Sequence, residues 1–249
     1  MLSILLLAAS VVTCQPPGST GECQRSAAGN KTGIGAALKR LGRDFAGLAA
    51  TENLMVLGAG GAASLAAYPW DSRLTESLST SSTLDMVLEA GDVGGGAVVQ
   101  TGFAVGTYLA GRLSHKESIR SLGSDLVRSQ IVAQTVTHAL KLATQRTRPD
   151  GSADSSFPSG HAAATFATAT VLTRHYGWKA GVPAYSFAAY VAASRLQENK
   201  HFASDVIFGA ALGVAAGRSV TFEWGPTTLA IGPTAVPGRG FGVAVSGSF

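Results

Sequence analysis

The chain has 249 residues, of which 46% are hydrophobic and only 14% are charged, and its formal net charge is +4. This length suits one domain with small appendages, and so low a charged fraction is unusual for a soluble globular protein. The sequence contains no long run of Lys or Arg. Nucleic-acid binding requires a basic stripe, so that class of function is set aside.

An apolar stretch near the N-terminus, 2–12, has the length of the hydrophobic core of a secretory signal peptide and is too short to span a membrane. The positive residues that usually precede such a core are missing. We expect a signal peptide over 1–14 that exports the protein to a bacterial-type cell envelope (periplasm or membrane). An exposed linker rich in Gly, Ser, Pro and Thr follows over 15–35. The two cysteines, Cys14 and Cys23, could pair only if both survive processing.

Seven further stretches have the length and the apolar content of helices. An amphipathic stretch comes first, and six apolar stretches follow it. They are 36–50, then 53–68, 93–111, 125–145, 160–174, 180–195 and 202–218. We therefore predict an all-α fold, a helical bundle of about six core helices over 36–222.

The relation of this bundle to a membrane is left open by its composition. The stretch 93–111 holds 19 residues without a charge and is the best spanning candidate, but it is rich in glycine and marginal for insertion. The stretch 125–145 contains Asp125, Arg128 and Lys141, which argues against lipid on every face. We expect a bundle that lies in or against a membrane.

The tail, 223–249, departs from the helical pattern. Phe241, Val243 and Val245 alternate with small residues after a turn at 237–240. This period of two predicts a β-hairpin appendage, packed on the surface of the protein itself.

The segment "KLATQRTRP" (141–149) places two cations near the end of a predicted helix. Lys141 and Arg148 are seven residues apart, about two turns, so both side chains are expected to project from one face. Pro149 is expected to end the helix just beyond Arg148. Taken alone, such a pair is more often a solvated stripe than a functional site.

The segment "FPSGHAAATF" (157–166) combines a helix start with a hydroxyl, a glycine and an imidazole. Pro158 and Ser159 mark the helix start, where the first backbone N–H groups have no partner within the helix. Gly160 allows a ligand to approach the backbone closely, and these amides suit a phosphate. His161 follows, placed to exchange a proton with a bound group. The alternative is an ordinary serine N-cap followed by a solvated histidine.

The segment "SRLQENKHFASD" (194–205) contributes Arg195, whose guanidinium can offer two parallel hydrogen bonds to phosphate oxygens. His201 and Asp205 are four residues apart, so a helix would place them on one face. A carboxylate beside an imidazole fixes its tautomer and stabilises its positive charge, which makes the other ring nitrogen a nucleophile. A surface His–Asp pair is the alternative.

Together, the three segments resemble the tripartite signature of the type 2 phosphatidic acid phosphatase superfamily, with every position filled in order over roughly 90–218. The resemblance implies a helical bundle that gathers the motifs into one phosphate pocket. It also implies that His201 attacks phosphorus and forms a phosphohistidine, that Asp205 orients it, and that His161 protonates the leaving oxygen and then activates water. The remaining positions would hold the phosphoryl oxygens: Lys141, Arg148, Ser159, Gly160 and Arg195.

The resemblance implies a phosphoric monoester hydrolase that needs no metal or other cofactor, because cationic side chains take the place of Mg²⁺. The acidic stretch 150–156 lacks the spacing of a calcium loop and is expected to form a turn. We expect a membrane-associated enzyme that acts on a phosphorylated lipid such as phosphatidate or an isoprenoid pyrophosphate. The alternatives are a secreted soluble acid phosphatase of small phosphomonoesters, a lipid phosphotransferase, a vanadium haloperoxidase (the scaffold is similar) and a non-catalytic binder of phosphorylated lipids.

Overall fold

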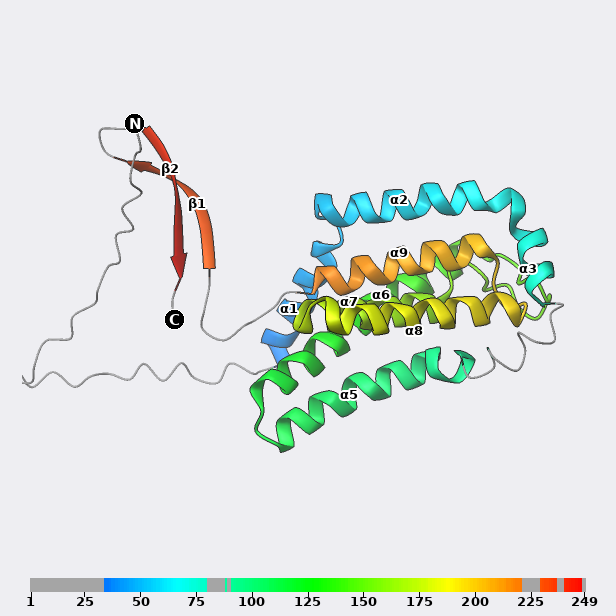
Figure 1. The fold of residues 1–249 in the computed structure, drawn as a ribbon, viewed down its shortest axis with the longest axis horizontal. Helices are drawn as coiled ribbons and strands as arrows, with labels where there is room; N and C mark the ends of the chain where they lie inside the picture. The colour runs from blue at the N-terminus through cyan, green and yellow to red at the C-terminus, as the bar shows by residue number, and fades with distance from the viewer. Residues whose placement is uncertain (1–33, 80–87, 89–90, 221–228, 237–239, 248–249) are drawn as a thin grey trace, which may run out of the picture.

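The computed structural model of the chain describes residues 34–79, 88, 91–220, 229–236 and 240–247 (Figure 1). The predicted signal peptide, both cysteines and almost all of the predicted linker lie outside these residues. In the described part that precedes residue 221, helices are the regular elements that form, as the all-α prediction requires.

The helices follow one another with short connections. They are α1 (Ile34–Gly47), α2 (Thr51–Ala67), the short 3-10 helix η1 (Tyr68–Trp70), α3 (Asp71–Ser79), α5 (Ala97–Leu113), α6 (Glu117–Thr144), α7 (Gly160–Tyr176), α8 (Trp178–Gln197) and α9 (Ala203–Ser219). Each apolar stretch of the sequence coincides with one of these helices. Nearer the C-terminus, β1 (Leu229–Val236) pairs antiparallel with β2 (Gly240–Gly247), Leu229 opposite Gly247. The packing of this tail on the bundle stays a prediction.

The central helix is α7, which packs against α6, α8 and α9 (Figure 1). Its buried residues are almost all Ala and Thr, so its neighbours can approach closely. The glycines Gly209, Gly213 and Gly217 of α9 recur at the four-residue interval that keeps them on one helical face. A Cβ atom on Gly209 would lie 2.5 Å from the carbonyl oxygen of Ser159, and one on Gly213 would lie 2.4 Å from that of Ala163. The backbone of α9 therefore rests directly on α7, and the scarcity of Leu, Ile and Phe reflects close packing of small residues.

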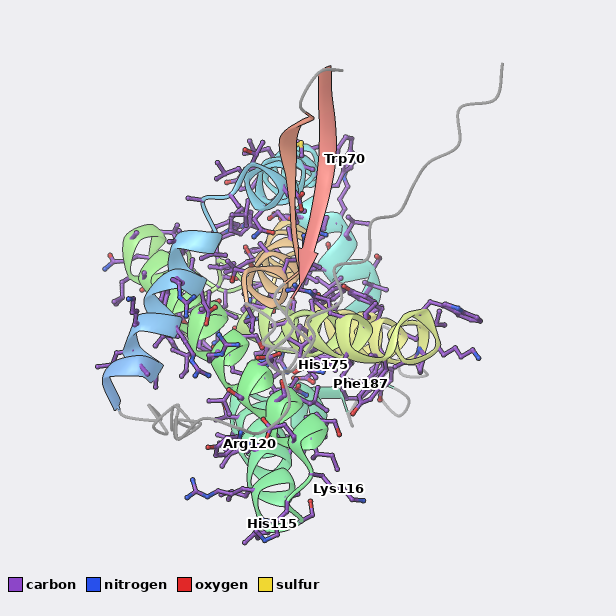
Figure 2. The ribbon with its side chains drawn as sticks, turned by 90° about the vertical axis from the view of Figure 1, so that its left-hand side faces the viewer. Trp70, His115, Lys116, Arg120, His175 and Phe187 are labelled. Atoms are coloured by element: carbon purple, nitrogen blue, oxygen red, sulfur yellow. The ribbon has the colours of Figure 1, made fainter. Side chains whose placement is uncertain are left out.

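The helices α5 and α6 form a second closely packed pair, joined by a tight turn in which His115 has a φ of 54°. A Cβ atom on Gly111 would lie 2.2 Å from the backbone nitrogen of Arg120, and one on Gly123 would lie 2.2 Å from that of Tyr108. Figure 2 shows His115 at the tip of this helical hairpin, away from the rest of the bundle.

Large apolar side chains are exposed on α2, α5 and α8. Examples are Met55 and Leu65 on α2, Val98 and Leu113 on α5, and Trp178 on α8. None of the described helices is both long enough and apolar enough to cross a membrane.

Candidate active site

The first motif lies across the end of α6 and not on one helical face. Lys141 occupies the last turn of α6, whereas Gln145 adopts a left-handed conformation (φ 44°) that ends the helix. The prediction that the helix continues to Arg148 is therefore wrong. The physical reason is that the next residues bond to a loop: the Arg148 N–H donates to the Ala153 carbonyl (2.9 Å) and the Ser156 N–H donates to the Arg146 carbonyl (2.8 Å).

The Lys141 ammonium points back over this loop and donates a hydrogen bond to the Ser155 carbonyl oxygen. Its pKa is lowered to about 8, first because burial disfavours the charged form and then because the positive charge of Arg148 lies nearby. The negative charge of Asp205 opposes this shift. Lys141 and Arg148 thus lie close enough to repel each other, as two cations that share one anion would.

Asp205, in the first turn of α9, connects all three motifs. Its side chain is fully buried and accepts hydrogen bonds from the Arg146 guanidinium (2.6 Å), the Ser156 hydroxyl and the Phe202 N–H (2.9 Å). Its main-chain carbonyl accepts the N–H of Ser159 (3.0 Å). Burial alone would raise the pKa of this carboxyl, but the donors outweigh burial, and the pKa is held below its usual range.

Sequence reasoning missed Arg146 and Asp71, which complete this buried network. The Arg146 guanidinium bridges Asp205 to Asp71 at the start of α3 (2.8 Å) and also donates to the Ser204 hydroxyl (2.7 Å). Its plane lies over the Phe202 ring, 4.2 Å from the centroid. A second arginine beside Arg148 was the one available sequence signal. Nothing in the sequence ties Asp71 to a residue 75 positions later.

In the second motif, Ser159 is the N-cap of α7, where its buried hydroxyl accepts the N–H of Ala162 at 3.4 Å. The capping alternative is therefore realised in this structure. With the Ser159 N–H bound to Asp205, the amides that the helix start can offer an anion are those of Gly160 and His161, which helix geometry leaves without an intrahelical acceptor.

His161 and Arg195 meet at a carboxylate that sequence reasoning also missed. The Oδ1 atom of Asp92 lies 3.2 Å from Nε2 of His161 and accepts a hydrogen bond from the Arg195 guanidinium, which also binds Glu198 (2.8 Å). The pKa of His161 is lowered to about 4, first by burial and then by the charge of Arg195, while Asp92 raises it and His201 lowers it. The one sequence signal for Asp92 was its position in a glycine-rich turn.

His201 is 3% exposed and precedes α9, which begins at Ala203, so the prediction of a helical His–Asp pair is wrong in its geometry. The pair still forms, because the turn into α9 brings Nδ1 of His201 to 3.8 Å from Oδ2 of Asp205. That distance is an ion-pair distance and longer than a hydrogen bond. Burial lowers the pKa of His201 although Asp205 opposes the shift, and Lys141 and Arg195 lower it further. The neutral, nucleophilic form of the imidazole is therefore favoured.

All three motifs meet at the end of the bundle beside α3, where α6 and α8 end and α7 and α9 begin (Figure 1). Their loops are tied to each other: the Asp150 N–H donates to the Asn199 carbonyl (3.1 Å), and Lys200 forms an ion pair with Asp150 (2.6 Å). The Ser152 N–H donates to the Asp150 carboxylate (2.9 Å), which confirms the predicted turn at 150–156. The structure thus brings together the predicted residues Lys141, Arg148, Ser159, Gly160, His161, Arg195, His201 and Asp205.

A cavity of about 370 Å³ opens beside Arg148, between α3 and the motif loops. It is lined mostly by polar side chains: Ser72, Thr75, Glu76, Ser79, Thr147, Arg148, Pro149, Asn199 and Phe202. The buried hydroxyl of Thr75 and the Nε atom of Arg148 have no hydrogen-bond partner. A polar group of a substrate could therefore reach the phosphate site from this side.

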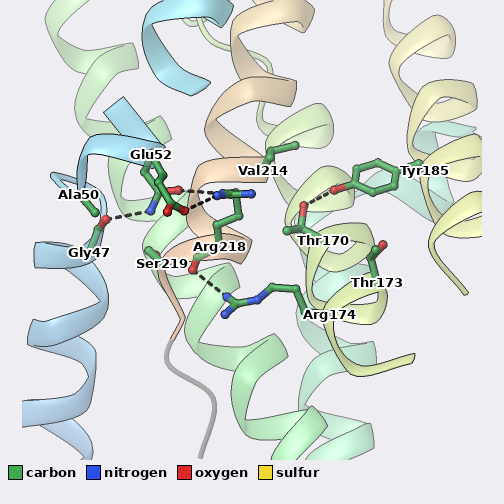
Figure 3. Close-up of a pocket in the computed structure, with 11 residues that line it drawn as sticks. Gly47, Ala50, Glu52, Thr170, Thr173, Arg174, Tyr185, Val214, Arg218 and Ser219 are labelled. Atoms are coloured by element: carbon green, nitrogen blue, oxygen red, sulfur yellow. Dashed lines mark hydrogen bonds and ion pairs between the residues drawn. The ribbon is translucent and has the colours of Figure 1, made fainter. Parts of the chain in front are cut away.

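A larger cavity, about 420 Å³, lies at the other end of α7 and α9 (Figure 3). Its polar side chains bind protein groups: Arg218 pairs with Glu52 (2.7 Å), Arg174 donates to the Arg218 carbonyl (2.7 Å), and Tyr185 bonds to Thr170 (2.8 Å). These contacts close the end of α9, so this cavity is a structural junction. Among the residues that the structure describes, no group of three or more His, Cys, Asp and Glu could hold a metal ion.

Residues 123–224 match the PAP2 superfamily. Over 86 residues, 33% of this chain, the sequence is 42% identical to the lipid A 1-phosphatase of Porphyromonas gingivalis. That match spans only 19% of the length of this curated relative.

Two solved structures are also similar. One is the transmembrane PAP2-type phosphatidylglycerolphosphate phosphatase of Bacillus subtilis, with a TM-score of 0.52 and 21% identity over 67% of this chain and 91% of that chain. The other is Aquifex aeolicus LpxE, with a TM-score of 0.45 and 21% identity over 59% of this chain and 91% of that chain. At this identity the Bacillus subtilis enzyme supports the helical fold.

Proposed function

Residues 123–224 form a PAP2 superfamily domain, and on that basis we propose that the chain is a metal-independent phosphatase that hydrolyses phosphomonoesters through a phosphohistidine. The observation that carries the proposal is the convergence of a neutral buried imidazole, a paired carboxylate and three cations at one end of the bundle. His201, Asp205 and Lys141 mark this arrangement.

In the first step, the neutral imidazole of His201 attacks phosphorus through Nε2, because Nδ1 faces Asp205. The bond between phosphorus and the leaving oxygen breaks, and that oxygen takes a proton from His161. The positive charge that develops on His201 is stabilised by the Asp205 carboxylate, whose lowered pKa keeps it ionised. Lys141, Arg148, Arg195 and the amides at the start of α7 bind the equatorial oxygens.

In the second step, His161 removes a proton from water, which attacks phosphorus and breaks its bond to His201. The products are orthophosphate and the free enzyme, so atoms and charge balance over the cycle. For His161 to act first as an acid, it must be protonated when the substrate binds. A bound phosphate dianion favours this, since it opposes the burial and the Arg195 charge that lower the pKa of His161.

We propose a phosphorylated lipid as the substrate. Two features support this choice. The names of the curated relative and the Bacillus subtilis enzyme describe phosphatases of lipid phosphates. The exposed apolar side chains of α2, α5 and α8 give the bundle outer faces suited to acyl chains or a membrane surface. Membrane association in the bacterial envelope is part of this proposal, as are the division of the chain at 36–222 and 223–249 and the hairpin tail.

The test is phosphate release from phosphatidate in mixed vesicles, compared with release from p-nitrophenyl phosphate, in the presence of EDTA. We expect activity that survives EDTA and favours the lipid. His201→Ala should abolish it, and His115→Asn is the matched control: it removes an imidazole at the α5–α6 tip, and Asn tolerates the left-handed φ there. Intact-protein mass after an alkaline quench should show one added phosphoryl group. Wild-type turnover by His201→Ala would refute the mechanism.

A further inference from the structure

The carboxylate of Asp92 occupies the phosphate site of the empty enzyme. Its Oδ1 atom contacts both the Arg195 guanidinium and Nε2 of His161 (3.2 Å), two groups that the proposed function assigns to the phosphoryl group and the leaving oxygen. An anion that binds Arg195 and His161 must therefore compete with a carboxylate that is already there.

The backbone that carries Asp92 is seated on α8 by its glycine neighbours. A Cβ atom on Gly91 would lie 2.5 Å from Oγ of Ser194, and one on Gly95 would lie 2.2 Å from a methyl carbon of Val191. Such approaches need glycine, because any side chain would push this segment away from α8. The segment therefore holds Asp92 against the last turns of α8, where Arg195 lies, and its contact belongs to the packing of the fold.

The charges around the site balance in this arrangement. The cations are Lys141, Arg146, Arg148 and Arg195, and the carboxylates are Asp71, Asp92, Glu198 and Asp205. With both histidines neutral, adding a phosphate dianion leaves two uncompensated negative charges in a largely buried pocket, which is costly. Protonation of His161 removes one of these, and the departure of one carboxylate removes the other.

Exposure identifies the carboxylate that can leave. The side chain of Asp92 is 50% exposed, whereas those of Glu198, Asp71 and Asp205 are 22%, 4% and 0% exposed. Asp92 can turn into solvent and be hydrated there. Asp71 and Asp205 could not leave without breaking the buried Arg146 network.

We propose that Asp92 is a displaceable internal competitor: its carboxylate holds Arg195 and His161 in the empty site, and the phosphoryl group of the substrate replaces it. This proposal rests on the proposed function. When hydrolysis leaves orthophosphate in the pocket, the returning carboxylate competes for the same two groups and shortens the stay of the product. Asp92 therefore sets the affinity for free phosphate and is not needed for bond cleavage.

The test is calorimetric binding of inorganic phosphate, which requires no turnover. Asp92→Asn keeps the shape of the side chain without its charge, and Asp92→Ser repeats the test with a smaller side chain. Glu117→Gln makes the same change in net charge at an exposed ion pair with Arg120 on α6, outside the site. We expect both Asp92 variants to bind phosphate about tenfold more tightly than wild type, and phosphate to inhibit them more strongly, with Glu117→Gln unchanged.

Three results would overturn the role of Asp92. Equal or weaker phosphate binding by both Asp92 variants would mean that this carboxylate only positions Arg195 and His161. An equal gain in Glu117→Gln would mean that net charge alone sets the affinity. Absence of phosphate binding in all the proteins, wild type included, would overturn the proposed function, and the role of Asp92 with it.

Discussion

Replacing Arg146 with Met should destabilise the protein and also impair its catalysis. The guanidinium is the shared partner of two buried carboxylates, Asp71 and Asp205, which come from α3 and α9. Met keeps most of the length of the side chain but removes the charge and all donors. Both carboxylates then stay in the interior with one cation fewer.

The magnitude follows from what is left unpaired. Arg146 donates to two carboxylates and one hydroxyl, and a hydrogen bond between charged groups contributes about 1.5–3 kcal/mol. Breaking a buried ion pair costs about 3–5 kcal/mol. The Arg146 side chain is 21% exposed, so water can enter and the lower end applies. We expect a loss of about 3 kcal/mol, or roughly 150-fold in the unfolding equilibrium constant.

Urea unfolding at pH 7 measures this loss. The part due to Asp205 should shrink in acid, with the sign set by its lowered pKa in the folded state. A carboxyl of that kind contributes stability above its unfolded pKa of about 3.9 and loses it as the pH falls through the folded value. The gap between wild type and Arg146→Met should therefore narrow below about pH 4.

Arg128→Met is the matched control, because Arg128 also bridges two buried carboxylates, Asp44 (2.9 Å) and Asp125 (2.5 Å). It lies thirteen residues before Lys141 in α6, about 20 Å along the axis. We expect a similar loss of stability with turnover per folded molecule unchanged, whereas Arg146→Met should lose turnover as well. A loss below about 1 kcal/mol for Arg146→Met, or equal turnover in both variants, would refute the reasoning.

The other predictions concern pH and packing. Because burial lowers the pKa of Lys141 to about 8, kcat/KM should fall above pH 8 as the ammonium is lost; Lys141→Arg should remove this limb, and an unchanged profile would count against a phosphate contact. The free enzyme should hold His161 neutral above about pH 4, so kcat/KM should rise as the pH falls toward 4, while an acid-independent kcat/KM would exclude it as the acid. Gly209→Ala places a methyl 2.5 Å from the Ser159 carbonyl and should lower stability by about 2 kcal/mol in thermal unfolding. Gly102→Ala, with open space around it, should be neutral or stabilise by up to about 1 kcal/mol, and equal effects of the two would contradict the packing argument.

The helices and the three motifs could be predicted because their signals are local. Apolar stretches of helical length stand between polar turns, and Ser159 before a run of small residues is an ordinary N-cap pattern. The chemistry of Lys141, His161 and His201 follows from residue type, and their order along the chain is enough to suggest one pocket. The structure agrees with these interpretations in the position of each helix and in the convergence of the motifs.

The remaining features depend on pairs that are far apart in the chain. Asp71 and Arg146 are separated by 75 residues, and Asp92 and Arg195 by 103, so no spacing rule connects them. The end of α6 was also hidden, because Gln145 takes the left-handed conformation where a glycine or asparagine would have signalled it. Sequence alone identified the cations and not which of them is already neutralised.

The bonds of Asp205 make the assembly of the site inseparable from local folding. The loop that carries Arg146 and Ser156, the start of α7 at Ser159 and the start of α9 at Phe202 all bond to this one residue. None of these segments can open alone without leaving a buried partner unsatisfied, so they should exchange their amide hydrogens as one cooperative unit. A folded protein with a half-built pocket is then a rare state, and substrate meets either the complete site or none.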